Sequence, residues 1–217
     1  MFGKSIRYDI IKGVVMEAIN MDVVEKDPLF YRIVRPILTF LFKVLYRPTI
    51  IGKENIPKSG RIVIAGNHTN NFDCILLIAS TKRCVHFLAK DELYKGFKKH
   101  LFKNMGIIPV NRRKKDGKSL KKAIDFLNKD MAIGIFPEGT FNRSENTILP
   151  FKIGAVKMAY ETNTKIVPFV IKGEYKLFKK SVKIVFFEPL EIKDSNLDNE
   201  NQRLMDLVSE KLEDSEV

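Results

Sequence analysis

Short apolar segments rich in β-branched residues alternate with amphipathic segments from residue 49 onward, and this alternation restricts the possible folds more than any other feature. The expected strands are RIVIAG, CVHFLAK, GIIPV, MAIGIFP, KIVPFVI and VKIVFF. The expected core positions of the helices between and after them are Leu120, Ala123, Ile124, Leu127, Val156, Ala159, Tyr160, Leu204, Leu207, Val208 and Leu212. Strands that alternate with helices predict an α/β fold, with a layered, largely parallel or mixed sheet flanked by helices.

The first 48 residues have a different pattern. They predict helices, one stopped at Pro28 and a second ended by Pro48. A chain of 217 residues is long enough for one domain with a sizeable core and a short additional segment. We therefore divide the chain into an N-terminal helical segment, residues 1–48, and an α/β domain, residues 49–217.

The segment YRIVRPILTFLFKVLYRP, residues 31–48, combines a polar stripe with a wide apolar surface. The stripe has a polar or cationic residue at every third or fourth position: Arg32, Arg35, Thr39, Lys43 and Arg47. Such a helix can lie in a membrane interface, or it can pack on the domain core with its arginines in water. No window holds the roughly 20 uncharged apolar residues of a spanning helix, and the N-terminus lacks the pattern of a secretory signal.

Lysine and arginine outnumber the acidic residues by 38 to 26, which gives the chain a formal charge of +12. This excess favours an anionic partner, such as a phosphate, an anionic membrane, a nucleic acid or an acidic carrier protein. The two cysteines, Cys74 and Cys84, suggest neither a disulfide framework nor a CxxC zinc motif. We therefore expect a reducing compartment and no metal site.

Two polar clusters follow expected strands. NHTNNFD, residues 67–73, follows RIVIAG, and PEGTFNRS, residues 137–144, follows AIGIF. Because the carboxyl ends of parallel strands meet at one edge of a sheet, the sites of α/β proteins gather there. The two clusters are therefore the first candidates for an active site.

His68 and Asp73 can form a catalytic pair only if the first cluster is not helical throughout. On a continuous helix, a separation of five residues would leave the two side chains roughly 140° apart. With His68 in a loop and Asp73 at the start of the helix DCILLIAS, the carboxylate can reach one ring nitrogen and leave the other free to act as a base. The alternative is that Asp73 only caps the helix and His68 is a polar turn residue.

Further polar or unusual residues lie at or in the other expected strands. Arg112 ends GIIPVNR, Lys90 ends FLAK, and Pro168 lies inside IVPFVI. Each has a plain structural explanation, namely a solvated run of charge, a surface lysine and an edge strand that tolerates proline. Their order along the chain, together with FPEGTFNRS, is harder to explain in that way.

In this order the motifs resemble those of the glycerolipid acyltransferases of the lysophosphatidic acid acyltransferase type, over roughly residues 49–190. NHTNNFD is similar to the NHxxxxD block, GIIPVNR to the block that ends in arginine, FPEGTFNRS to the FPEGT block and IVPFVI to the proline block. PFKIGA, after the third block, is also similar to the family. One position departs: many members have arginine directly after FPEGT, where this chain has Phe141, and its Arg143 comes two residues later.

The resemblance implies an acyltransferase. His68 would be the general base on the free hydroxyl of 1-acyl-glycerol-3-phosphate (lysophosphatidic acid), oriented by Asp73, and the product would be phosphatidic acid. The acyl donor would be acyl-CoA or an acyl-acyl carrier protein, with no covalent acyl-enzyme, no metal and no cofactor. The residues for which the family blocks imply substrate binding or shaping of the site are Asn67, Arg112, Glu138, Gly139, Thr140, Arg143 and Pro168. Lys90, at a strand end, could add a phosphate contact.

The resemblance also favours the membrane-interface interpretation of residues 31–47, because some family members have an N-terminal helical segment that docks on the membrane. We expect a peripheral or monotopic protein on the cytoplasmic face of the cell membrane, with the anionic membrane surface as a partner. The alternatives are an acyltransferase or transacylase for another lysophospholipid, and a non-enzymatic basic module on a membrane surface or nucleic acid. A nucleic-acid module predicts aromatic residues interleaved with basic ones, which RRKK and KLFKK do not show convincingly, so we expect no nucleic acid.

Overall fold

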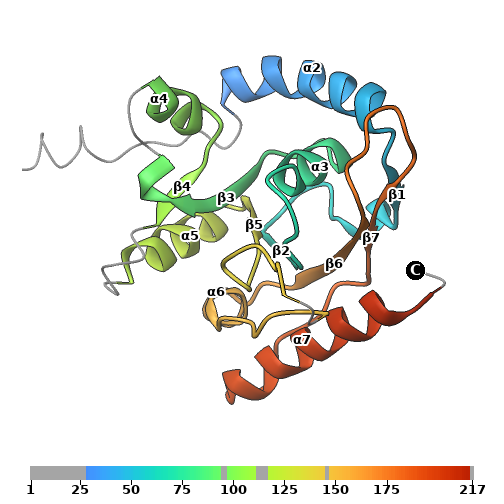
Figure 1. Cartoon of the computed structure of the whole chain (residues 1–217). Coiled ribbons are helices and arrows are strands. Elements are labelled where there is room, and N and C mark those ends of the chain that lie inside the picture. Colours follow the sequence, from blue (N-terminus) through green and yellow to red (C-terminus); the bar gives the residue numbers. More distant parts are fainter. Residues whose placement is uncertain (1–27, 94–96, 111–116, 145–146, 216–217) are drawn as a thin grey trace, which may run out of the picture.

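The computed structural model describes residues 28–93, 97–110, 117–144 and 147–215 (Figure 1). The helix expected before Pro28 lies outside these residues. The described helices are α2 (Leu29–Tyr46), α3 (Asp73–Ser80), α4 (Phe97–Asn104), α5 (Lys118–Asn128), α6 (Gly154–Glu161) and α7 (Leu197–Glu213), with 3₁₀ turns at Lys53–Asn55 and Asp91–Leu93.

One mixed sheet forms the centre of the fold. Its strands are β1 (Thr49–Ile51), β2 (Ile62–Gly66), β3 (Val85–Lys90), β4 (Ile108–Val110), β5 (Ala132–Ile135), β6 (Ile166–Gly173) and β7 (Val182–Phe186). They lie in the order β1-β7-β6-β2-β5-β3-β4, and all neighbours are parallel except β6 and β7. The predicted α/β fold with a largely parallel or mixed sheet is therefore confirmed. β1 was not among the expected strands, because a three-residue segment shows no periodicity.

The sheet divides the core into two layers, as β2 shows. Ile62 and Ile64 belong to the apolar cluster under α2 and α3, whereas Val63 and Ala65 belong to the cluster under α5, α6 and α7. Successive side chains of a strand point to opposite faces, and here helices cover both faces (Figure 1). This arrangement explains why the strand sequences are apolar throughout rather than alternating. Tyr160 on α6 was expected in the core, but it is exposed.

Pro168 lies in the middle of the sheet. β6 runs between β2 and β7, and Pro168 is the register partner of Ala65. The edge-strand interpretation of this proline is therefore wrong. Its carbonyl accepts the backbone N–H of Phe187 at 2.9 Å, but it has no N–H of its own to donate to a neighbouring strand.

α2 packs on the domain through a face that is aromatic and partly polar. Tyr31 and Phe42 are buried, and the Tyr31 hydroxyl donates to the carbonyl oxygen of Arg83 at 3.0 Å. Arg35 Nε donates to the carbonyl oxygen of Thr81 at 3.0 Å. The interpretation that places the arginines of this helix in water is therefore wrong for Arg35.

The outward face of α2 is apolar. Its exposed large side chains are Leu29, Phe30, Ile33, Ile37, Phe40, Leu41 and Val44. Arg32, Lys43 and Arg47 are exposed as well. A contiguous apolar face of this kind marks an interaction surface. No described helix has the length and apolar character that crossing a bilayer requires.

Candidate active site

His68 and Asp73 meet at the carboxyl end of β2. The strand ends at Gly66, residues 67–72 form a loop, and Asp73 is the first residue of α3. His68 Nδ1 lies 2.9 Å from Asp73 Oδ2. The loop thus brings together two side chains that a continuous helix would hold apart.

Hydrogen bonds reach both oxygens of the buried Asp73 carboxylate. Oδ2 accepts the backbone N–H groups of Thr69 at 2.7 Å and Asn70 at 2.8 Å, in addition to its contact with His68. Oδ1 accepts the Tyr175 hydroxyl at 2.6 Å. These donors hold a charged group in the interior at a fixed position, because each removes part of the cost of taking the carboxylate out of water.

The carboxylate also fixes the tautomer of the histidine. Phe72 is the N-cap residue of α3 and no side chain caps the helix there, so Asp73 is not a helix cap. An ionised carboxylate can only accept hydrogen bonds, and His68 Nδ1 must therefore carry a proton. His68 Nε2 is then the lone-pair nitrogen, which is the arrangement a general base requires.

Two phenylalanines enclose the imidazole of His68. Its ring stacks on Phe136, with centroids 3.9 Å apart and planes 14° apart, and the Phe141 ring lies 4.4 Å away. Only 14% of the His68 side chain is exposed. Phe141 is the residue that stands where many family members have arginine. In this chain it supplies an apolar wall beside the ring.

Glu138 fixes the backbone of His68 rather than facing an open site. The side chain is buried, and its two oxygens accept the N–H groups of His68 at 2.7 Å and Leu149 at 2.9 Å. Burial raises the pKa of the Glu138 carboxyl, and these two hydrogen bonds oppose that shift. The carbonyl oxygen of His68 accepts the N–H of Asn142 at 2.9 Å. FPEGTFN therefore holds His68 from both of its peptide groups.

Asn67 is also engaged by the protein. Its side-chain amide donates to the carbonyl oxygen of Ile171 at 2.9 Å and accepts the N–H of Ile171 at 2.7 Å. The side chain is buried. The Asn67 side chain thus forms the next pair of hydrogen bonds to β6 after the end of β2. These bonds fix the start of the loop that carries His68.

Gly139 and three cations complete the region. Gly139 has φ +70°, and a Cβ there would collide with Nζ of Lys152, which lies over the turn. Lys152, Lys90 and Arg143 are exposed, and none forms an ion pair with another described residue. Thr140 is exposed too. Arg112 lies outside the described residues. Lys152 lies in PFKIGA but was not among the expected site residues.

A family model described as Acyltransferase matches residues 47–172. The chain belongs to this acyltransferase family. It is 37% identical over 136 residues to a 1-acyl-sn-glycerol-3-phosphate acyltransferase of Borreliella burgdorferi, a match that covers 61% of this chain and 54% of the relative. It is 33% identical over 147 residues to the enzyme of the same name from Bacillus subtilis, covering 65% of this chain and 72% of the relative. The chain thus spans about half the length of the first of these acyltransferases.

The fold of this acyltransferase also has a solved counterpart. The crystal structure of the 1-acyl-sn-glycerophosphate (LPA) acyltransferase PlsC from Thermotoga maritima aligns with a TM-score of 0.68 at 22% sequence identity. The alignment covers 94% of this chain and 88% of the other. The two proteins share a fold.

The Glu138 contacts lead to a first prediction for the acyltransferase. Glu138→Gln should destabilise the protein by about 1–3 kcal/mol, because the glutamine offers one acceptor where two N–H groups need acceptors. Turnover should fall together with the free energy of unfolding, while the KM for the acceptor should stay nearly constant. Thermal unfolding and steady-state kinetics measure these effects. A large rise in acceptor KM at unchanged stability would instead assign Glu138 to substrate binding.

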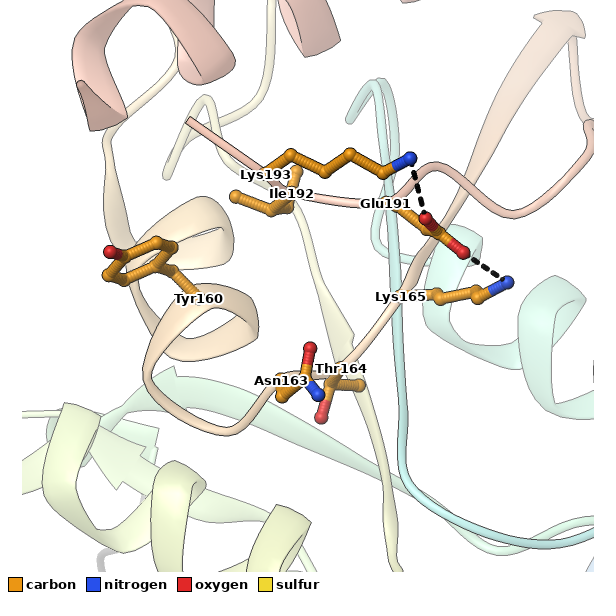
Figure 2. A pocket seen from close by; sticks show the side chains of 7 residues that line it. All are labelled: Tyr160, Asn163, Thr164, Lys165, Glu191, Ile192 and Lys193. Atoms are coloured by element: carbon orange, nitrogen blue, oxygen red, sulfur yellow. Dashed lines mark ion pairs between the residues drawn. The ribbon is translucent and has the colours of Figure 1, made fainter. Parts of the chain in front are cut away.

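A pocket of about 620 Å³ lies at the opposite end of the sheet (Figure 2). Its lining residues are Tyr160, Asn163, Thr164, Lys165, Glu191, Ile192 and Lys193. Lys165 precedes β6, whose first residue, Ile166, is in register with Val63 near the start of β2. Glu191 pairs with Lys165 at 2.7 Å and with Lys193 at 3.0 Å, and these contacts lower its pKa to about 2. Glu191 is shared by both lysines, and the pocket lies at the end of the sheet opposite to His68, so it is not our candidate site.

The described residues contain no group of three or more His, Cys, Asp or Glu side chains that could hold a metal ion.

Proposed function

We propose that this acyltransferase moves a fatty acyl group from an acyl thioester to the free hydroxyl of 1-acyl-glycerol-3-phosphate and so forms phosphatidic acid. The observation that carries the proposal is the 2.9 Å contact of His68 Nδ1 with the buried Asp73 carboxylate, in the first of four motifs that occur in family order. The relatives from B. burgdorferi and B. subtilis are named for this acceptor.

The reaction is a single displacement. His68 Nε2 takes the proton of the acceptor hydroxyl as its oxygen attacks the thioester carbonyl, and Asp73 stabilises the imidazolium that forms. The tetrahedral intermediate then breaks its carbon–sulfur bond. The proton on His68 passes to the departing thiolate, so that an ester and a free thiol result. This route has no covalent acyl-enzyme and calls on no metal or cofactor, and the co-substrate is acyl-CoA or acyl-acyl carrier protein.

The loop after β5 has donors that suit the developing oxyanion. The N–H groups of Gly139 and Asn142 already donate to Phe136 and His68 carbonyls, at 2.9 Å each. Those of Thr140 and Phe141, which lie between them in the chain, have no acceptor among the described residues. Two adjacent backbone donors beside the base would stabilise negative charge on the thioester oxygen. We assign this role to Thr140 and Phe141.

The acceptor phosphate would lie among the exposed cations of the same edge. Lys90 ends β3, Arg143 follows the β5 loop, and Lys152 lies over Gly139. Arg112 joins this set through its motif alone. Unpaired cations bind phosphate well, and arginine can do so with two parallel hydrogen bonds. The apolar Phe141 stands in the usual arginine position. The preference of this enzyme for an acceptor could therefore differ from that of its relatives.

An acceptor and donor screen tests the proposal. Purified protein is supplied with acyl-CoA and with the matched acyl-acyl carrier protein, each against lysophosphatidic acid and lysophosphatidylcholine. We expect phosphatidic acid to form rapidly and the choline lipid to be a poor acceptor. Equal rates with both acceptors would assign the chain to the broader class of lysophospholipid acyltransferases, and no transfer to either would refute the proposal.

We also propose that the protein is a peripheral or monotopic protein on the cytoplasmic face of an anionic membrane, and the outward face of α2 supports the attachment to a membrane surface. Ile37 and Phe40 are 59% and 67% exposed, and cations border them on the same helix. An apolar face with flanking cations suits the boundary between headgroups and acyl chains. The lipid acceptor would then reach the site from the surface to which the enzyme is bound.

Ile37→Ser combined with Phe40→Ser should weaken binding to anionic vesicles by about 10-fold or more, because two exposed apolar side chains no longer enter the interface. Added salt should weaken binding by the unaltered protein, since it screens the attraction between cations and lipid. Vesicle sedimentation measures both effects. Leu101→Ser combined with Tyr160→Ser is the control, because these exposed residues lie on α4 and α6. Equal losses in both double variants would contradict membrane docking by α2.

A further inference from the structure

The loop between β6 and β7 presents two large apolar side chains to the exterior. Leu177 is 56% exposed and Phe178 is 62% exposed. The backbone N–H of Phe178 donates to the carbonyl oxygen of Leu45 in the last turn of α2. Figure 1 shows this loop rising from the sheet to the C-terminal end of α2. The exposed Leu177 and Phe178 therefore lie in a loop that is joined to the C-terminal end of α2.

Phe178 keeps this position in an unfavourable backbone conformation. Its φ is +59°, in the left-handed region that bulky residues rarely adopt. Such strain persists only where something compensates for it. The hydrogen bond to Leu45 holds the backbone in this conformation, but most of the Phe178 side chain stays exposed and gains little burial from the described residues.

The charges around the loop indicate what kind of partner this is. Lys179 and Lys180 follow Phe178, are exposed, and form no ion pair with another described residue. Lys43 and Arg47 are exposed at the neighbouring end of α2. Lys176 alone is paired, with Glu174 at 2.7 Å. Apolar side chains beside unpaired cations fit an anionic phospholipid surface.

The same loop carries a direct contact to the catalytic pair. Tyr175, two residues before Leu177, donates its hydroxyl to Asp73 Oδ1 at 2.6 Å. Its ring contacts those of Phe42, Tyr46 and Phe72, with centroids 6.1, 5.8 and 5.6 Å away. Burial, followed by the Asp73 charge, raises the pKa of the Tyr175 hydroxyl, so this group remains a donor at neutral pH. One short segment thus links the exterior face to the carboxylate that orients His68.

We propose that the β6–β7 loop, residues 174–181, is a second contact with an anionic phospholipid surface, beside α2, and that its Tyr175 is a positioning residue for Asp73. Docking of the loop and the geometry of the His68–Asp73 pair are then coupled, because Tyr175 and the docking residues Leu177 to Lys180 belong to the same short segment. This inference rests on the proposed acyl transfer, and it adds to it a membrane element that lies far from the N-terminal segment in the sequence.

Vesicle binding tests the surface contact. Leu177→Ser combined with Phe178→Gly should weaken binding to vesicles of phosphatidylcholine and phosphatidylglycerol by about 10-fold, while the melting temperature holds, because glycine adopts the φ of Phe178 without strain. Tyr160→Ser is the control, since it removes an exposed ring from α6. Unchanged vesicle affinity with an altered oligomeric state would assign the face to a second copy of the chain. Unchanged affinity with faster trypsin cleavage in residues 1–27 would assign it to that segment, and either result overturns the proposal.

Tyr175→Phe tests the positioning role. It keeps the ring and removes only the hydroxyl that Asp73 accepts, so kcat should fall about 10-fold with the KM of both substrates unchanged. The downfield Nδ1 proton resonance of His68 should move as well, because the carboxylate that accepts that proton has lost a donor. Tyr46→Phe is the matched control: it removes a hydroxyl from the same aromatic cluster and should change neither quantity. A Tyr175→Phe enzyme with normal kcat and an unmoved resonance overturns the assignment.

Failure of the proposed function has a different signature. If the unaltered protein makes no phosphatidic acid, acyl transfer to this acceptor is refuted, while the vesicle and resonance measurements still decide the role of the loop. If the unaltered protein is active and the loop variants bind vesicles normally, only the further inference fails.

Discussion

His68→Ala should lower the turnover of phosphatidic acid formation by about 10² to 10⁴, because the enzyme loses the base that takes the acceptor proton. The KM values should change far less, since the imidazole contributes little binding in the ground state. The His68 ring packs on Phe136, so a small loss of stability should accompany the change. Steady-state kinetics on mixed vesicles and thermal unfolding measure these effects.

The chain contains a matched control for this substitution. His100 is exposed on α4, and His100→Ala should leave turnover unchanged. His86 is unsuitable as a control, because it is buried and its Nδ1 lies 2.8 Å from the carbonyl oxygen of Gly106. A His68→Ala enzyme with turnover within a few-fold of normal would remove His68 from the mechanism.

Asp73→Asn should lower turnover by about 10² to 10⁴ while the fold persists. The asparagine oxygen can still accept the N–H groups of Thr69 and Asn70, and its amide can donate to the Tyr175 oxygen. The charge that stabilises the His68 imidazolium is lost. The free energy of unfolding should fall by no more than about 1–3 kcal/mol, because charged hydrogen bonds are replaced by neutral ones.

Asp130→Asn is the control for charge removal at an aspartate. Its partner is Arg61, at 3.4 Å on the surface, and such pairs contribute about 0–1 kcal/mol. It should change neither turnover nor stability appreciably. If Asp73→Asn behaved in the same way, Asp73 would be a structural residue only, and the orientation of His68 would need another cause.

The strand pattern predicted the fold class and most of its elements. DCILLIAS, expected as a helix, is α3, and the six expected strands correspond to β2 through β7. The strand order could not be predicted, because each parallel connection returns through a helix and the sequence does not fix which neighbour it reaches. Pro168 illustrates this limit: a proline favoured an edge strand, yet the chain places it between two other strands.

The candidate site could be predicted from the sequence where its residues lie close together in the chain. His68 and Asp73 lie five residues apart, and a turn followed by a helix suffices to join them. Tyr175 lies 102 residues from Asp73, and nothing in the sequence around it signals the contact. Glu138 was expected near substrate because the resemblance to the FPEGT block implies binding of the acceptor. In the structure its two oxygens accept two backbone N–H groups, which no residue pattern reveals, and binding of substrate by Glu138 stays a prediction.

The central claim is that His68 and Asp73 act as one catalytic unit in phosphatidic acid formation. The most direct measurement is kcat for His68→Ala, Asp73→Asn and the double variant, with lysophosphatidic acid and one acyl thioester at saturation. If the pair is a unit, removing the base leaves Asp73 nothing to orient, and the double variant should be no slower than His68→Ala alone. If the two reductions multiplied in the double variant, Asp73 would act independently of His68, and that result would contradict the account.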